Sequence, residues 1–322
     1  MIRSRKIRQY FVAPFALLAI CASASPARAI TFEAPMELSR WQVDASVFAC
    51  KLYQPLNRYG EAVFMRRAGE PQRFYLHEQN RQFAEGEAQL LVQAPRWQGS
   101  AAQRRLGSVP VVSGAEPIRM DWQASQRLIG ELQNGQQLLF SHHAWYADST
   151  PVSVVLEPIR FRLAFTEFQQ CLGGLLPVNY DQINRSSVVF TGGMSEFEPD
   201  QQPLLDNVIQ YVLADQHVTT VVIDGHTDGQ GLRADNLELS KQRAEFVAAY
   251  LKTRGVAEDL IQVRWHGERY PVASNRSAAG RAENRRVTLR IDRFEPKEQS
   301  LEARGDNISP SSNDPAAAET QS

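Results

Sequence analysis

The sequence predicts an α+β protein: an N-terminal all-β sandwich or barrel-like domain with a closing helix, followed by a C-terminal α/β sandwich. Three observations lead to this prediction. Residues 30–158 hold many short β-branched and aromatic runs separated by glycine and proline turns, which is typical of sandwiches and barrels. Residues 159–176 change to a helical period. Residues 186–293 alternate strand-like runs with amphipathic helices, as an α/β sandwich requires.

The N-terminal domain is expected to span residues 30–180 and to consist mainly of strands. The expected strands are 48–54, 61–67, 73–77, 88–93, 137–141 and 152–156. Asn134-Gly135 is a dipeptide typical of a hairpin turn. The pattern between residues 96 and 130 is weak, so no strand is assigned there.

The first 29 residues are expected to be a signal peptide rather than part of the fold. A basic stretch at residues 3–8 precedes a short apolar run at 10–22, and Ala27-Arg28-Ala29 has the form of a cleavage site. The apolar run is too short to span a bilayer, and no other stretch approaches that length. The mature chain, from Ile30, is therefore expected in the periplasm without a transmembrane segment. Lipidation at Cys21 remains an alternative.

Charge and composition limit the partners of the mature chain. The net charge is −1 for the whole sequence and becomes −6 once the five cations of the signal peptide are removed. A mildly acidic chain is poorly suited to bind nucleic acid. Residues 295–322 are rich in Ser, Pro, Asn, Glu and Ala and poor in large apolar groups, which predicts a disordered tail.

The two cysteines that follow the signal peptide are expected to form one disulfide bond. Cys50 belongs to a predicted strand, and Cys171 belongs to the helix at residues 159–176. A pair of cysteines in an exported protein usually forms a disulfide, although two buried free thiols remain possible. The bond would clamp the closing helix to the β region.

The C-terminal domain is expected to span residues 186–293, after a linker at 180–185. The expected strands are 187–191, 219–224, 261–266 and 287–292, and the expected helices are 202–215 and 236–253. Asp235 and Glu238 resemble a capping box at the start of the second helix. Two helices on one mixed sheet form an α/β sandwich.

Polar residues at the end of a buried strand predict a ligand site in this domain. Asp228 follows the strand 219–224, where a loop can expose polar groups. Asn236, Ser240 and Arg243 are spaced i, i+4 and i+7, so they share one helical stripe. A guanidinium favours a carboxylate and an aspartate favours an ammonium group. The site therefore suits an amino-acid zwitterion, such as the free end of meso-diaminopimelate in a peptidoglycan stem peptide.

Three spaced motifs make this part of the chain resemble the OmpA C-terminal domain, a non-covalent peptidoglycan-binding module. The motifs are GHTD at 225–228, LSKQRA at 239–244 and GRAENRRV at 280–287. The resemblance implies that Asp228 and Arg243 grip diaminopimelate, and that Thr227, Asn236 and Arg285 line the site. Residues 229–232 depart from the usual loop of the family. The resemblance implies no catalysis and no cofactor.

Other roles exist for these residues. Asp228 could be only a turn residue, and Arg243 only a surface cation whose stem covers apolar neighbours. His226 could suggest a metal or catalytic pair, but no second histidine or carboxylate cluster follows at ligand spacing. The sequence shows no nucleophile elbow, phosphate loop or clear carboxylate pair, so we expect neither an enzyme nor a metal site.

The N-terminal region resembles the MotY family of flagellar motor proteins. The resemblance lies in CKLYQP at 50–55, YGEAVF at 59–64, Arg67-Ala68 and FQQC at 168–171. It implies a periplasmic motor component that anchors or stabilises the stator or basal body. The C-terminal domain would bind peptidoglycan, and the N-terminal domain would contact basal body or stator proteins. A general envelope tether of the OmpA type is the alternative.

Overall fold

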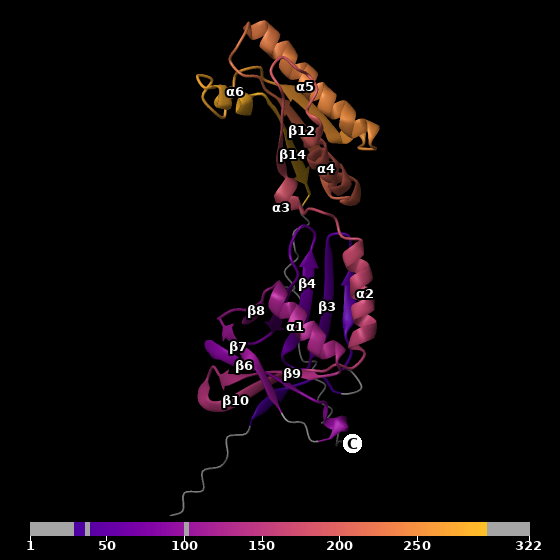
Figure 1. Ribbon diagram of the computed structural model, residues 1–322, viewed down its shortest axis with the longest axis vertical. Helices are drawn as coiled ribbons and strands as arrows, with labels where there is room; N and C mark the ends of the chain where they lie inside the picture. The colour runs from indigo at the N-terminus through magenta and orange to yellow at the C-terminus, as the bar shows by residue number, and fades with distance from the viewer. Residues whose placement is uncertain (1–28, 36–38, 100–102, 295–322) are drawn as a thin grey trace, which may run out of the picture. The chain divides into compact units, whose positions relative to one another are not determined.

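A computed structural model describes residues 29–35, 39–99 and 103–294 (Figure 1). The predicted signal peptide, apart from its last residue, and the predicted tail at 295–322 lie outside the described residues. The chain divides into two compact units. The first contains residues up to 45 together with 51–66 and 71–170, and the second contains 46–50, 67–70 and the chain from 171 onward.

Two five-stranded sheets form the N-terminal fold. The first has the order β1 (Ile30–Phe32), β10 (Ala147–Leu156), β9 (Gln137–Ala144), β6 (Gly86–Gln93) and β7 (Arg104–Val111). The second has the order β2 (Gln42–Ala45), β3 (Ala49–Leu56), β4 (Gly60–Arg67), β5 (Arg73–Glu78) and β8 (Ile118–Met120). All neighbours are antiparallel in the first sheet except β1 and β10.

The core of this fold lies between the two sheets. Phe74 of β5 and Phe140 of β9 stack with ring centroids 5.6 Å apart, and both are fully buried. Alternate residues of β3 are buried, which is the period-two pattern of a strand with one face on the core. The six strands expected from the sequence are all present, and two separate sheets form an open sandwich rather than a closed barrel.

The segment that the sequence left unassigned contains β7, β8, the short 3-10 helix η1 (Arg96–Gln98) and a helix. Helix α1 (Trp122–Gln133) begins at Asp121, whose side chain accepts a hydrogen bond from the Ala124 amide. The hairpin predicted at Asn134-Gly135 is wrong, because these residues end α1. Gly135 has a positive φ of 78°, and its amide donates to the Leu132 carbonyl. A helix end and a hairpin turn both need a residue that tolerates this conformation.

The closing helix and the predicted disulfide are both present. Helix α2 (Phe161–Gly173) buries Phe161 and Phe168, and Cys171 bonds to Cys50 with 5.9 Å between their Cα atoms. The segment expected to be a linker is partly helical. A capping box between Asn179 and Gln182 stabilises the start of helix α3 (Tyr180–Ile183).

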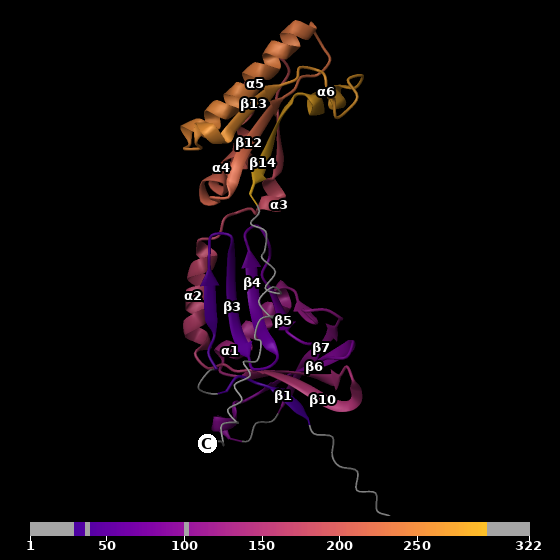
Figure 2. The same cartoon turned by 180° about the vertical axis from the view of Figure 1, so that it is seen from behind.

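The C-terminal fold is a four-stranded mixed sheet covered on one face by two helices (Figures 1 and 2). The sheet order is β11 (Arg185–Val189), β14 (Arg286–Arg293), β12 (Val218–Gly225) and β13 (Ile261–Trp265). The helices are α4 (Gln202–Ala214), α5 (Arg233–Thr253) and α6 (Ala278–Asn284), with short 3-10 helices η2 (Pro199–Gln201) and η3 (Glu258–Leu260). β12 pairs with β13 in parallel and with β14 antiparallel, and α4 and α5 bury the apolar side of the sheet.

Helix α5 begins earlier than expected. Its N-cap is Leu232, so the capping box predicted at Asp235 and Glu238 is wrong and both residues lie inside the helix. The helix packs very closely on β12: a Cβ atom on Gly225 would lie 2.0 Å from the Ser240 carbonyl oxygen. Glycine at this position therefore lets helix and strand approach. Among the described residues, no helix is long and apolar enough to cross a membrane.

Candidate functional site

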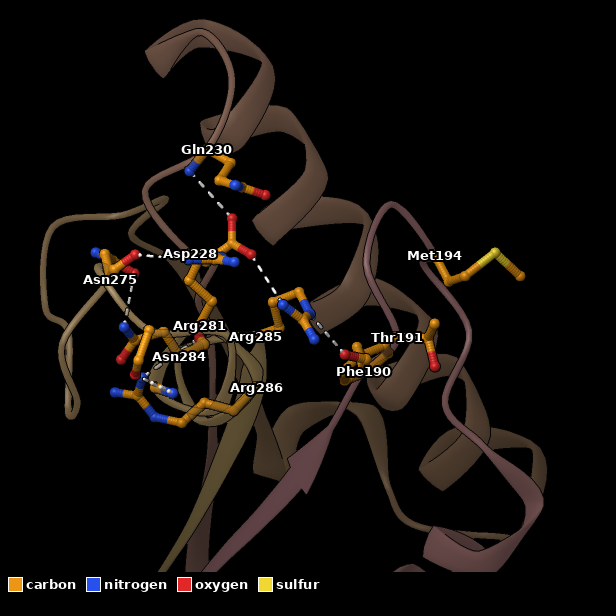
Figure 3. A network of polar contacts seen from close by, with 12 residues as sticks. Phe190, Thr191, Met194, Asp228, Gln230, Asn275, Arg281, Asn284, Arg285 and Arg286 are labelled. Atoms are coloured by element: carbon orange, nitrogen blue, oxygen red, sulfur yellow. Dashed lines mark hydrogen bonds and ion pairs between the residues drawn. The ribbon is translucent and has the colours of Figure 1, made fainter.

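Two of the predicted site residues, Asp228 and Arg285, face each other where the loop after β12 meets the end of α6 (Figure 3). Asp228 follows β12, and its carboxylate lies 3.0 Å from the Arg285 guanidinium. The other carboxylate oxygen accepts a hydrogen bond from the Gln230 amide at 3.1 Å. Only 11% of the Asp228 side chain and 19% of the Arg285 side chain are exposed, so this ion pair is mostly shielded from water. A ligand that reaches it meets charges that water screens weakly.

Arg243 is more deeply placed than the sequence suggested. Its side chain is fully buried, and it donates hydrogen bonds to the carbonyls of Thr191, Met194 and His226. Burial and the nearby Arg285 charge lower the pKa of Arg243 to about 10, so the guanidinium remains charged at neutral pH. The carboxylate of Asp228 pairs with Arg285 rather than with Arg243. Arg243 therefore joins α5 to the loops after β11 and β12.

This position predicts that Arg243→Ala loses stability as well as any ligand contact. Removing the guanidinium leaves three carbonyl oxygens without their donor, and each buried acceptor left unsatisfied costs about 1–3 kcal/mol. Arg243→Lys should lose less, because it keeps the charge and part of the donor set. Urea unfolding of the three proteins measures the difference. Equal stability of wild type and Arg243→Ala would contradict the bonding role.

The remaining predicted residues line the same region. Thr227 and Asn236 are buried, and the Asn236 amide donates to the Glu268 carboxylate at 2.6 Å. Among the described residues, the Thr227 hydroxyl has no hydrogen-bond partner in the protein. Ser240 accepts a hydrogen bond from the Gly267 amide, which holds the loop after β13 against α5.

Sequence reasoning gave no role to Asn284, although it lies inside the third motif. Its fully buried side chain accepts from the amides of Val272 and Ala273 and donates to the Ala273 carbonyl and to Asn275. These four bonds fix the loop after β13, which passes close to Gly229. An amide is the only side-chain group that supplies two acceptor and two donor bonds at one point. Its place in the third motif, directly before Arg285 and Arg286, was the available signal.

A second polar cluster lies where β12 and β13 end. The rings of His226 and His266 stack 5.0 Å apart, and His266 Nε2 lies 2.7 Å from the Asp224 carboxylate. Burial, together with the charge of Arg286, lowers the pKa of His226 to about 4. Within the described residues, no group of three His, Cys, Asp or Glu side chains is placed to hold a metal ion.

The low pKa of His226 predicts an acid-sensitive fold. The folded state favours neutral His226, whereas the unfolded chain protonates near its ordinary pKa of 6.5. Stability is therefore complete above pH 6.5 and falls as the pH drops toward 4, by about 2–3 kcal/mol. Urea unfolding of wild type and His226→Asn at pH 7.5 and at about pH 4.5 isolates the contribution of His226 to the free energy of unfolding. If both proteins lost the same free energy of unfolding between the two pH values, this contribution would be contradicted.

Comparison with known proteins assigns both halves of the chain. The MotY N-terminal domain family matches residues 32–177, and the OmpA family matches residues 189–285. The chain is also 24% identical over 265 residues to the sodium-type flagellar protein MotY of Vibrio parahaemolyticus, which covers 81% of this chain and 90% of that protein. The chain carries a MotY N-terminal domain followed by an OmpA-family domain. The resemblance found in its sequence is thereby confirmed.

Two further relatives match the C-terminal part of the chain. The peptidoglycan-binding protein ArfA of Mycobacterium tuberculosis is 47% identical over 72 residues, which are 22% of each chain. The crystal structure of the peptidoglycan-associated lipoprotein from Burkholderia pseudomallei is 31% identical, with a TM-score of 0.32 and coverage of 33% of this chain and 89% of that one. The chain therefore shares only about a fifth of its length with ArfA.

Proposed function

We propose that this protein is a periplasmic component of the flagellar motor that anchors the stator or basal body to peptidoglycan. The observation that carries the proposal is the order of domains. A MotY N-terminal domain and an OmpA-family domain follow each other as in a flagellar MotY protein, over 90% of that relative's length. A motor must transmit torque to a rigid object, and the cell wall is the rigid object in the envelope.

The wall-binding half of the proposal rests on the Asp228 site. We assign peptidoglycan binding to Thr227, Asp228, Asn236, Arg243 and Arg285. Asp228 would accept the ammonium group of diaminopimelate, and Arg285 would face its carboxylate. The buried Arg243 contributes positive charge beneath them and fixes two of the loops. In this proposal the site holds a charged ligand non-covalently, and the function involves neither catalysis nor a cofactor.

The motor half of the proposal rests on the N-terminal domain. Its partners are expected to be flagellar basal body or stator proteins. Export by the predicted signal peptide would place the chain in the periplasm, where both the wall and the motor are accessible. A disulfide between Cys50 and Cys171 suits that oxidising compartment.

Deletion of the gene separates this function from the general envelope tether. The proposal predicts cells that build flagella but swim poorly, with an intact envelope. Swimming speed and release of periplasmic enzymes into the medium are measured in the same cultures. Normal swimming with a leaking envelope would contradict the motor function and support the tether.

A further inference from the structure

The face of the C-terminal sheet opposite α4 and α5 carries an open polar groove. Val188, Val221 and Leu289 point into the core beneath the helices. The residues that alternate with them along the strands face the other way. A groove of about 420 Å³ on that face is lined by Arg185, Ser186, Ser187, Asp224, Thr288, Leu289 and Arg290. We call it the sheet-face groove.

Two arginines stand side by side in this groove. Arg185 of β11 and Arg290 of β14 are direct cross-strand partners. Such partners share a face, with Cβ atoms about 4.5–5.5 Å apart, and like charges in this position are destabilising. Among the described residues, Arg290 pairs with Asp292 at 3.1 Å, whereas no carboxylate lies within ion-pair distance of Arg185. The sheet therefore places two positive charges side by side at a cost to its stability.

Neutral donors lie beside the arginine pair. Ser187 and Thr288 are the next cross-strand partners on the same face, and each supplies a hydroxyl group. On the other side of β14, Asp224 of β12 is the cross-strand partner of Thr288. The Asp224 carboxylate lies 2.7 Å from Nε2 of His266. Guanidinium and hydroxyl donors on one surface form a binding site for a carboxylate, because charge-assisted hydrogen bonds to carboxylates are strong.

One end of the groove lies near the candidate site. Its Asp224 end contacts His266, whose ring stacks on His226, and Thr227 and Asp228 follow directly in the chain. We propose that the sheet-face groove is a second contact with the wall polymer and binds a free carboxylate of a stem peptide. This proposal rests on the proposed function, because it extends the peptidoglycan site at Asp228.

The test measures binding of the full chain to purified peptidoglycan sacculi by co-sedimentation, and of free diaminopimelate by calorimetry. The variant is Arg185→Gln with Arg290→Gln. A matched control, Lys252→Gln with Arg254→Gln, removes the same charge from the exposed end of α5. We expect the groove variant to bind sacculi about tenfold more weakly than the control, with a smaller dependence on salt. Its affinity for free diaminopimelate and its thermal stability should not decrease.

Three outcomes distinguish this proposal from the proposed function on which it rests. If the groove variant binds sacculi as tightly as the control, the second contact is absent and the face serves another partner. If the groove variant unfolds at a lower temperature than wild type, the arginines have a structural role and the proposal also fails. If wild type does not bind sacculi and matches Asp228→Ala, the proposed function itself fails.

Discussion

Asp228→Ala is expected to abolish most of the affinity for peptidoglycan while the fold remains intact. The Asp228 carboxylate is only 11% exposed and is paired with Arg285 at 3.0 Å, at the edge of the loop after β12. In the proposed complex Asp228 pairs with the ammonium group of the ligand, and truncating one member of such a buried pair costs about 2–5 kcal/mol of binding free energy. The dissociation constant for sacculi should therefore rise at least about 30-fold.

A charge-matched control makes this result specific. Asp259→Ala removes an exposed carboxylate from η3 and should bind sacculi like wild type. Asp228→Asn keeps the shape and the acceptor for the Gln230 amide but loses the charge, so it should resemble Asp228→Ala. Circular dichroism checks that all three variants are folded. Wild-type binding by both Asp228 variants would contradict the assigned site.

Removing the disulfide is expected to give the largest loss of stability. The bond between Cys50 and Cys171 closes a loop with a sequence separation of 121 residues. In the chain-entropy model, a loop of this length stabilises the folded state by about 4–5 kcal/mol. The double variant Cys50→Ser and Cys171→Ser should therefore unfold at a clearly lower urea concentration than wild type.

Reduction of the native protein supplies the matching control. Wild type in a thiol reductant should unfold like the double serine variant, and the reductant should not change the variant. Binding to free diaminopimelate should stay near wild type in both, because Asp228 and Arg285 belong to loops far from the cysteines in the sequence. Unchanged urea midpoints after reduction would contradict a stabilising role for the bond.

The sequence predicted elements well where one pattern dominated. Strand β3 alternates buried and more exposed residues, and β12 contains a run of consecutive buried residues. Both patterns are typical of strands and identify them in the sequence. Helix α1 was missed because it lies in a weak segment beside short strands, where the apolar spacing is brief. Asn134-Gly135 was misassigned because the same left-handed glycine ends a helix or turns a hairpin.

The site was predicted as a set of residues but not as a set of contacts. Motif spacing predicted that Asp228 and Arg243 lie at the same end of the sheet, and in the structure Arg243 bonds to the carbonyl of His226, two residues before Asp228. Spacing could not show that Asp228 pairs with Arg285 or that Arg243 is buried under three carbonyls. Those choices depend on how three loops meet, and each loop is fixed by partners distant in sequence, such as Asn284.

Swimming of a deletion strain that carries Asp228→Ala tests the central claim most directly. Wild-type protein and the variant are expressed at equal levels in the periplasm of cells that lack the gene. The account predicts that wild type restores swimming and that Asp228→Ala leaves cells flagellated but slow, with an intact envelope. Full swimming with Asp228→Ala would contradict a motor anchored to the wall through this site.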